Sequence, residues 1–150
     1  MAKQIEIAFS TDDRAPEFCP HCGQRLRPWK KAIISTAVAS LCRLVAMYQG
    51  EPIHHDLFAC RIQDRNFPQL HLWRLIVPAA NHDSYKRSSG KWSPTPAGVE
   101  FALGLRTVPK FVVTANGRFI RHEGPEITIH EALGSRFDYE QLIKMQERAA

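Results

Sequence analysis

Apolar residues between positions 29 and 49 recur at steps of three and four, and this spacing predicts a helix with one buried face. Leu41 and Val45 lie on that face. Pro28 precedes the pattern, where a first-turn proline is favourable, and Gly50 follows it as a helix-ending residue. The pattern therefore predicts one long helix over 29–49.

Two shorter helices are predicted next, over 54–62 and 67–73. Asn66 suits the N-cap of the second of these, with Gln69 three residues on in the capping-box position. The helix is followed by an extended apolar segment at 75–78. The pattern thus changes from helix to strand near Arg74.

A hairpin is predicted over 85–92, with Ser89-Gly90 as its turn. Three cations flank that turn: Lys86, Arg87 and Lys91. Thr95 then suits an N-cap with Pro96 at the first helical position, and the apolar residues up to Leu105 are expected to return to the core. Three helices followed by a hairpin predict an α+β fold with a winged helix-turn-helix core over 29–106.

The remaining segments are predicted to extend the same domain. Over 107–150, Asn116-Gly117 between two apolar runs predicts a hairpin, and Thr128 with Glu131 has the spacing of a capping box before a short helix. A last helix is expected after Phe137. In the N-terminal segment 1–28, alternating apolar residues near the start predict a strand.

Composition limits the class of protein. The 150 residues suit one domain, and we find neither a signal peptide nor an apolar stretch that would span a membrane. The four cysteines do not form the pattern of a secreted disulfide framework. We therefore expect an intracellular, cytoplasmic location.

The distribution of charge is more informative than the net charge of +5. Residues 18–50 and 101–122 contain Lys and Arg but no Asp or Glu, whereas acidic residues outnumber basic ones from Glu123 onward. Both basic blocks would attract a polyanion. The alternative is that they only make the surface soluble.

Cys19 and Cys22 are the candidate metal ligands. They enclose Pro20 and His21 and precede Gly23, and this spacing is typical of a zinc knuckle, in which one tight turn presents two thiolates. Two further ligands are needed, and the candidates are His21, His54, His55, Cys60 and Cys42. Cys42 lies beside the apolar stripe and is predicted to be buried. A knuckle that has lost its zinc and a redox dithiol remain alternatives.

The sequence contains no phosphate loop, dinucleotide-binding glycine motif, zinc-protease helix or serine elbow, so we predict no enzyme. His130 and Glu131 are better explained by the first turn of a capped helix. Trp73 and Trp92 are predicted in the core. Trp29, among basic residues, either lies exposed near phosphates or packs at the start of the long helix.

Four motifs in one order resemble largely uncharacterised bacteriophage and prophage proteins: 70–76 (LHLWRLI), 90–98 (GKWSPTPAG), 108–112 (VPKFV) and 137–142 (FDYEQL). The resemblance implies a winged-helix-like fold, an N-terminal Cys-x-x-Cys and a phage or prophage origin. This chain departs from the pattern at Arg74, where a glycine is expected, so the helix before it is expected to end differently. Gln69, His71 and Leu72 also stand where a basic residue is expected.

These observations favour a double-stranded DNA binder, and the resemblance suggests a phage transcription regulator. Gln69, His71 and Arg74 would lie near the groove, and the backbone would be contacted by other cations: Lys30, Lys31, Lys86, Arg87 and Lys91. The alternative is a module that docks on a host protein through Leu72 and the last helix around Tyr139, Leu142 and Ile143. That helix would also suit a homodimer.

Overall fold

The computed structural model describes residues 17–18, 21–23, 25–26, 28–60, 65–115 and 118–148. The helices are α1 (Ser35–Met47), α2 (His55–Phe58), the 3-10 helix η1 (Phe67–Trp73), α3 (Pro96–Ala102), α4 (Ile129–Leu133) and α5 (Tyr139–Arg148). The strands are β1 (Glu17–Phe18), β2 (Arg25–Leu26), β3 (Pro28–Ala32), β4 (Ile53–His54), β5 (Ile76–Pro78), β6 (Lys91–Pro94), β7 (Val108–Ala115) and β8 (Arg118–Ile127).

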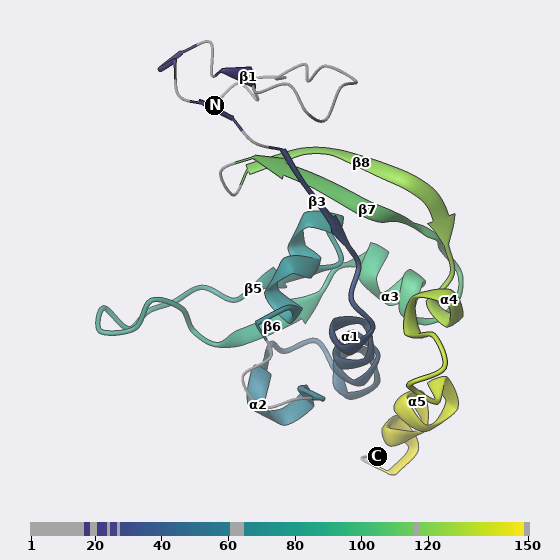
Figure 1. Cartoon of the computed structure of the whole chain (residues 1–150). Coiled ribbons are helices and arrows are strands. Elements are labelled where there is room, and N and C mark those ends of the chain that lie inside the picture. The colour runs from purple at the N-terminus through teal and green to yellow at the C-terminus, as the bar shows by residue number, and fades with distance from the viewer. Residues whose placement is uncertain are drawn as a thin grey trace.

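The fold is mixed α+β, as predicted. Two three-stranded antiparallel sheets have the orders β3-β7-β8 and β4-β6-β5, and β1 pairs with β2. Figure 1 shows the first sheet above η1 and α1, with α4 and α5 on the right and a long loop leaving the second sheet on the left. The core lies between these layers around α1, in which Leu41 and Leu44 are fully buried.

The helix predicted over 29–49 is shorter than expected, because α1 begins only at Ser35. Residues 28–32 form β3, which pairs antiparallel with β7 from Pro28↔Ala115 to Ala32↔Phe111. The N–H of Ile33 continues the ladder by donating to the Lys110 carbonyl at 2.9 Å. The prediction was wrong because this pairing is non-local and leaves no periodic signal in the segment itself.

The next two predicted helices are also modified. Only His55–Phe58 of the segment 54–62 is helical among the described residues, and His54 belongs to β4. The range 67–73 is confirmed, but as a 3-10 helix. Asn66 is the N-cap residue as predicted, but its side chain makes no capping hydrogen bond, and its backbone carbonyl accepts the N–H of Gln69 at 3.0 Å.

The hairpin after η1 exists, but its turn was misplaced. β5 and β6 pair from Ile76↔Pro94 to Pro78↔Trp92, and residues 79–90 form the loop between them. Ser89 lies at the base of this loop, where its hydroxyl donates to the Ala79 carbonyl at 3.0 Å. The loop is therefore longer than the predicted turn at Ser89-Gly90, and Lys91 lies at its base.

The C-terminal predictions are largely confirmed. Thr95 caps α3, and Thr128 with Glu131 forms the capping box of α4. β7 and β8 form the expected hairpin, although Asn116-Gly117 lies outside the described residues. Leu105 was expected in the core but is 75% exposed.

No helix within the described residues has the length and apolarity needed to cross a membrane. The strand predicted near the start also lies outside the described residues.

Candidate functional site

The helix η1 lies between the core and the sheet β3-β7-β8. Four of its side chains are buried, namely Phe67, Leu70, Leu72 and Trp73. The indole Nε1 of Trp73 donates to the Pro109 carbonyl on β7 at 2.7 Å, and the Phe67 ring meets Trp92 edge-on at 5.6 Å. The core role predicted for Trp73 and Trp92 is therefore confirmed. Only one side of η1 faces outward.

Leu72 does not lie on that outward side. It is only 8% exposed, and its carbonyl oxygen lies 3.0 Å from Nε2 of His122 on β8. The prediction that Leu72 contacts a partner protein was therefore wrong. In the 3-10 helix η1 this residue points inward, whereas the resemblance had placed it on the outward face, where a basic residue is expected.

The other predicted groove residues lie on the accessible side of η1. His71 and Arg74 are exposed, and Gln69 is half-buried. The Oε1 of Gln69 accepts from Lys31 Nζ at 3.4 Å, and Nδ1 of His71 lies 2.6 Å from the Pro68 carbonyl. The side chains of Gln69, His71 and Arg74 are therefore accessible at the surface, but they cover only a short stretch of it.

Lys30 and Lys31 were predicted to act together, and the structure separates them. Successive residues of a strand point to opposite faces of the sheet. Lys31 reaches Gln69, whereas Nζ of Lys30 lies 4.4 Å from the centroid of the Phe111 ring as a cation–π contact. Only Lys31 belongs to the surface around η1.

A groove of about 510 Å³ lies between β3 and η1. Leu70, Trp73 and Ala37 contribute apolar walls, while Lys31 and Arg65 contribute positive charge. The groove therefore adds a positively charged recess beside the exposed row of η1.

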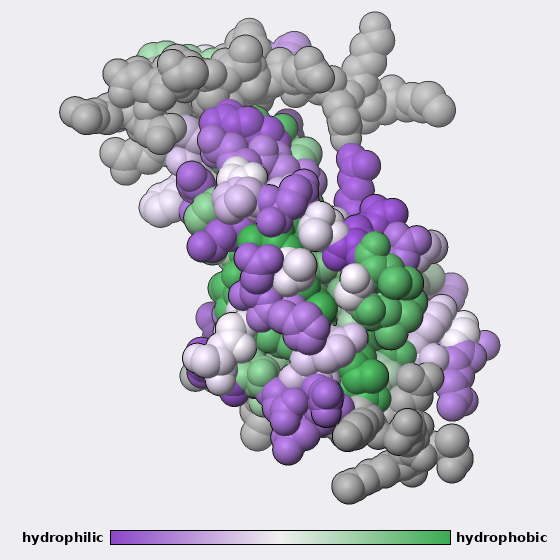
Figure 2. Space-filling view, turned by 90° about the vertical axis from the view of Figure 1, so that its right-hand side faces the viewer, coloured by the Kyte–Doolittle hydropathy of each residue, from purple (hydrophilic) through white to green (hydrophobic). Residues whose placement is uncertain are grey.

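The loop 79–90 and the first residue of β6 carry the remaining predicted cations. Lys86, Arg87 and Lys91 are exposed, and none forms an ion pair with another described residue. Figure 1 shows the loop projecting far from the body. The opposite side of the molecule is instead of mixed character, with hydrophobic residues between hydrophilic ones (Figure 2). The loop therefore presents cations that form no ion pair with a described acid, although Asp83 adds one negative charge to the same loop.

Local hydrogen bonds order the loop. The amide Nδ2 of Asn81 donates to the Lys86 carbonyl at 2.6 Å, and the N–H of Tyr85 donates to Asp83 Oδ1 at 2.9 Å. Such side-chain bonds to nearby backbone are typical of turns built on Asn and Asp. They bring the backbone of Lys86 close to Asn81. They leave Tyr85 itself 98% exposed at the outer part of the loop.

The candidate zinc site is only partly described. Cys22 is exposed in the segment between β1 and β2, and Cys19 lies outside the described residues. Within the described ranges, no group of three or more His, Cys, Asp or Glu is arranged to hold a metal ion. Zinc binding by Cys19 and Cys22 stays a prediction.

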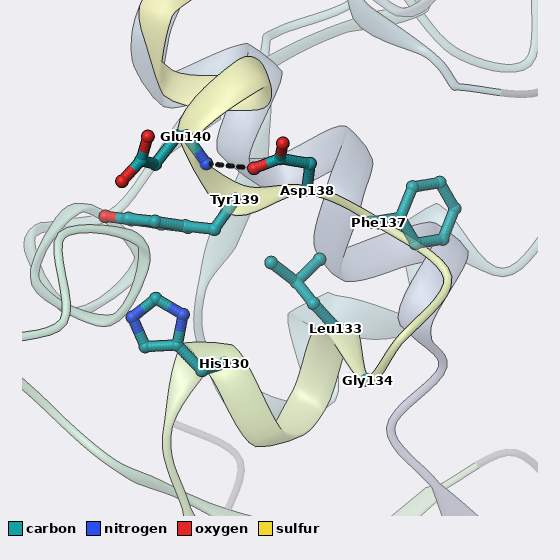
Figure 3. A pocket seen from close by; sticks show the side chains of 7 residues that line it. All are labelled: His130, Leu133, Gly134, Phe137, Asp138, Tyr139 and Glu140. Atoms are coloured by element: carbon teal, nitrogen blue, oxygen red, sulfur yellow. Dashed lines mark hydrogen bonds between the residues drawn. The ribbon is translucent and has the colours of Figure 1, made fainter.

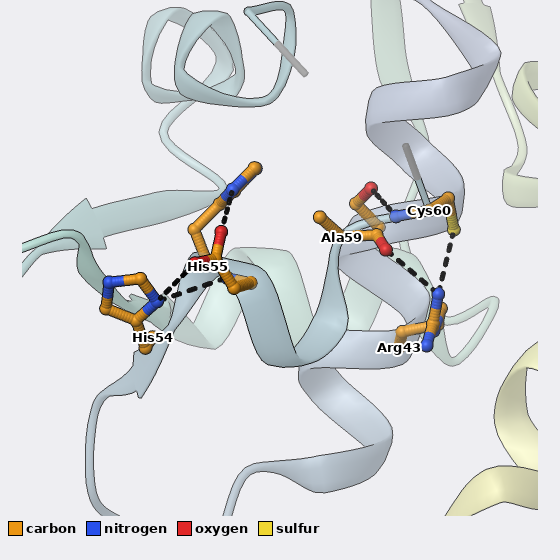
Figure 4. A network of polar contacts seen from close by, with 7 residues as sticks. Arg43, His54, His55, Ala59 and Cys60 are labelled. Carbon is orange, nitrogen blue, oxygen red and sulfur yellow. Dashed lines mark hydrogen bonds and ion pairs between the residues drawn. The ribbon is translucent and has the colours of Figure 1, made fainter. Parts of the chain in front are cut away.

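His21 is exposed between β1 and β2, whereas the other candidate ligands have structural roles, which Figure 4 shows for His54, His55 and Cys60. Nδ1 of His54 accepts the N–H of Asp56 at 3.2 Å, and the His55 ring packs against Phe58 and Phe67. His55 is half-buried. Both side chains are thus engaged in the packing around α2.

Cys60, which follows α2, helps to hold that helix on α1. The N–H of Cys60 donates to the Ser40 hydroxyl at 3.1 Å, and Arg43 Nη1 lies 3.8 Å from Cys60 Sγ (Figure 4). Cys42 is fully buried, as predicted. Burial, and then the neighbouring Cys60, raise the pKa of the Cys42 thiol to about 12. Cys42 therefore stays protonated at neutral pH, which suits a core residue and not a metal ligand.

The C-terminal helix α5 packs on the core through its described apolar side chains. Tyr139, Leu142 and Ile143 are half-buried and pack against the core cluster. The hydroxyl of Tyr139 donates to the Ala102 carbonyl at 2.6 Å, and its ring meets His130 at 4.7 Å beside a pocket of about 500 Å³ (Figure 3). The partner surface predicted on these three residues therefore serves the packing of α5.

Comparison with known proteins gives no match: no protein family, no curated protein and no solved structure is similar enough to this chain to be significant. The arrangement of residues is therefore the basis for an inference about function.

Proposed function

We propose that the protein binds double-stranded DNA through a winged-helix arrangement and acts as a phage or prophage transcription regulator. The order α1-β4-α2-η1-β5-β6, together with the sheet order β4-β6-β5, is the order of elements in a winged helix. In that interpretation η1 is the recognition helix and the loop 79–90 is the wing.

The observation that carries the proposal is the projecting loop with its free cations. Lys86 and Arg87 belong to the loop that projects from the body in Figure 1, and Lys91 begins β6 at the base of that loop. Phosphate contacts by such residues supply most of the affinity of a DNA-binding protein for any sequence. Lys31 adds a further cation beside η1.

Base reading is expected to be weak. Four of the seven residues of η1 are buried, so His71, Gln69 and Arg74 are the side chains left to approach base edges. Backbone contacts position a protein on DNA, while base contacts specify the sequence. We therefore propose binding that tolerates many sequences. Lys30 is left out of the interface because it stacks on Phe111 on the other face of the sheet.

Titration of a labelled DNA duplex with Arg87→Ala tests the proposal. We expect a several-fold loss of affinity that is similar for unrelated duplex sequences, because a phosphate contact is removed. Arg136→Ala is the matched control, since Arg136 is equally an exposed arginine but lies between α4 and α5. Equal affinities of the two variants would contradict a role of the loop in binding.

A further inference from the structure

The groove between β3 and η1 has the size and the lining of a site for a small ligand. Its volume of about 510 Å³ lies within the range of about 300–1,000 Å³ that such sites occupy. Ala37, Leu70 and Trp73 are almost fully buried and form its floor, whereas Ile34 lines it with 39% of its surface exposed. An occupant would therefore meet a largely apolar surface.

Hydrogen bonds hold the floor of the groove in place. The indole Nε1 of Trp73 donates to the Pro109 carbonyl on β7 at 2.7 Å, and the carbonyl of Leu70 accepts the N–H of Leu75 at 3.3 Å. Ligand sites are usually pre-formed in this way. Because its N–H is already bonded, Trp73 offers an occupant only the apolar surface of its ring.

Two cations border the same groove. Lys31 on β3 and Arg65 before η1 both line it, and both are exposed. Neither forms an ion pair with another described residue, and none of the described residues that line the groove is Asp or Glu. The groove therefore has positive charge that nothing described within it balances.

Lys31 has capacity to bind an anion. Its Nζ donates to Gln69 Oε1 at 3.4 Å, which is longer than the distance of about 2.8 Å that is usual between an ammonium and a carboxylate. An ammonium group carries three donors, so this one contact leaves donors for a carboxylate. A guanidinium such as that of Arg65 binds a carboxylate through two parallel hydrogen bonds.

The amino end of α1 adds to the positive potential that Lys31 and Arg65 supply. Ile34 is the N-cap residue of α1 and gives no side-chain hydrogen bond to the first turn, which contains no acidic residue. The amino end of a helix carries a partial positive charge. Ile34 and Ala37, on either side of that end, both line the groove.

We propose that the groove binds a small carboxylate with an aromatic or other apolar body. The apolar body would lie on Ile34 and Trp73, and the carboxylate would bind Lys31 and Arg65. A neutral apolar molecule would leave the two cations unpaired, and a simple inorganic anion would leave the floor in contact with water. The proposal goes beyond DNA binding and does not rest on it.

Calorimetric titration of the full-length protein with 2-naphthoate, in the absence of DNA, tests the inference. We expect a Kd of about 1 mM or tighter, the affinity typical of a ligand of this size. Lys31→Gln and Arg65→Gln should each weaken binding about 5-fold, because one charged partner is lost. Lys30→Gln is the matched control and should leave the affinity unchanged, since Lys30 lies on Phe111 on the opposite face of β3.

A neutral probe separates the contribution of charge from that of apolar contact. 2-Naphthalenemethanol has the same ring without the carboxylate, and we expect equal affinities for it in the wild type and Lys31→Gln. No binding of 2-naphthoate, or unchanged affinity of both Lys31→Gln and Arg65→Gln, would overturn the inference. An equal loss in Lys30→Gln and Lys31→Gln would also overturn it, because attraction by the overall charge would then explain the binding.

A second measurement does not depend on a variant. In nitrogen-15 NMR spectra of the wild type, 2-naphthoate should shift the indole N–H signal of Trp73, which lines the groove. The signal of Trp92, which packs against Phe67, should stay in place. An unmoved Trp73 signal at saturating 2-naphthoate would contradict binding in the groove. The two proposals can fail separately, since Arg87→Ala tests the duplex site and the 2-naphthoate titrations contain no DNA.

Discussion

At the scale of single residues, Arg74 has a backbone conformation that its side chain disfavours, and hydrogen bonds to other residues hold it there. It has a φ of 59°, the left-handed conformation that favours glycine. Its N–H donates to the His71 carbonyl at 2.9 Å, and its own carbonyl accepts from Thr95 Oγ1 at 2.6 Å. The missing glycine was expected to change the end of this helix. That expectation was wrong, because the helix still ends in the left-handed conformation.

Replacement of Arg74 tests this strain. The left-handed conformation costs about 1–2 kcal/mol for a residue with a Cβ atom, and part of this is offset by the greater freedom of glycine in the unfolded chain. We expect Arg74→Gly to exceed Arg74→Ala in free energy of unfolding by about 1 kcal/mol, measured by urea denaturation. Both variants lack the guanidinium, so an alanine variant as stable as the glycine variant would show that the backbone is not strained.

Cys42 gives a prediction for stability against pH. Its pKa is raised from 9.0 to about 12, first by burial and then by Cys60. Above pH 9 the unfolded thiol loses its proton while the folded one keeps it. The stability due to the neutral thiol is therefore complete below pH 9 and decreases as the pH rises towards 12.

The measurement is the free energy of unfolding between pH 8 and pH 11, compared with Cys42→Ala. We expect the wild type to lose more stability over this range than the variant, by about 1 kcal/mol or more per pH unit above pH 9. Parallel curves would show that Cys42 does not titrate differently in the folded and unfolded chain.

At the scale of elements, sequence patterns predicted best where the signal was local. The capping residues Thr95 and Thr128 and the hairpin around 116–117 all depend on neighbouring residues, and the structure has a helix or hairpin at each. The strand β3 and the turn of the loop 79–90 were missed. Both depend on hydrogen bonds to distant partners, β7 and Ala79, which local spacing does not reveal.

The contact of α3 with the end of η1 depends on Gly98. A Cβ atom at this position would clash with the backbone carbonyl of Leu75, which also accepts the N–H of Thr95 at 3.0 Å. We expect Gly98→Ala to lower the free energy of unfolding by about 1–3 kcal/mol, since overpacking forces the backbone apart.

Glu100→Ala in the same helix is the control for that experiment. Glu100 forms a partly exposed ion pair with Arg106 at 2.7 Å, and such pairs contribute at most about 1 kcal/mol. If thermal or urea denaturation shows Gly98→Ala to be as stable as the wild type, α3 does not pack as closely on Leu75 as the structure indicates.

At the scale of the whole molecule, the cations predicted to contact the DNA backbone lie in two places, around the loop 79–90 and on β3. The sequence did not reveal this division. The loop cations were predicted from composition and spacing, and they are exposed as expected. Trp29, for which an exposed position was one of two alternatives, is 62% exposed. The groove between β3 and η1 was not predicted. Its lining comes from β3, α1 and η1, which meet only in the folded chain.

The central claim is that free cations on the loop 79–90 bind the phosphates of duplex DNA. The most direct test is the dependence of the duplex association constant on salt concentration, compared between the wild type and Arg87→Ala. With Lys86, Arg87 and Lys91 in contact, the slope of log K against log salt should be about −3 or steeper, and Arg87→Ala should make it shallower by about 0.9. A wild-type affinity that does not change with salt, or identical slopes for the two proteins, would contradict the account.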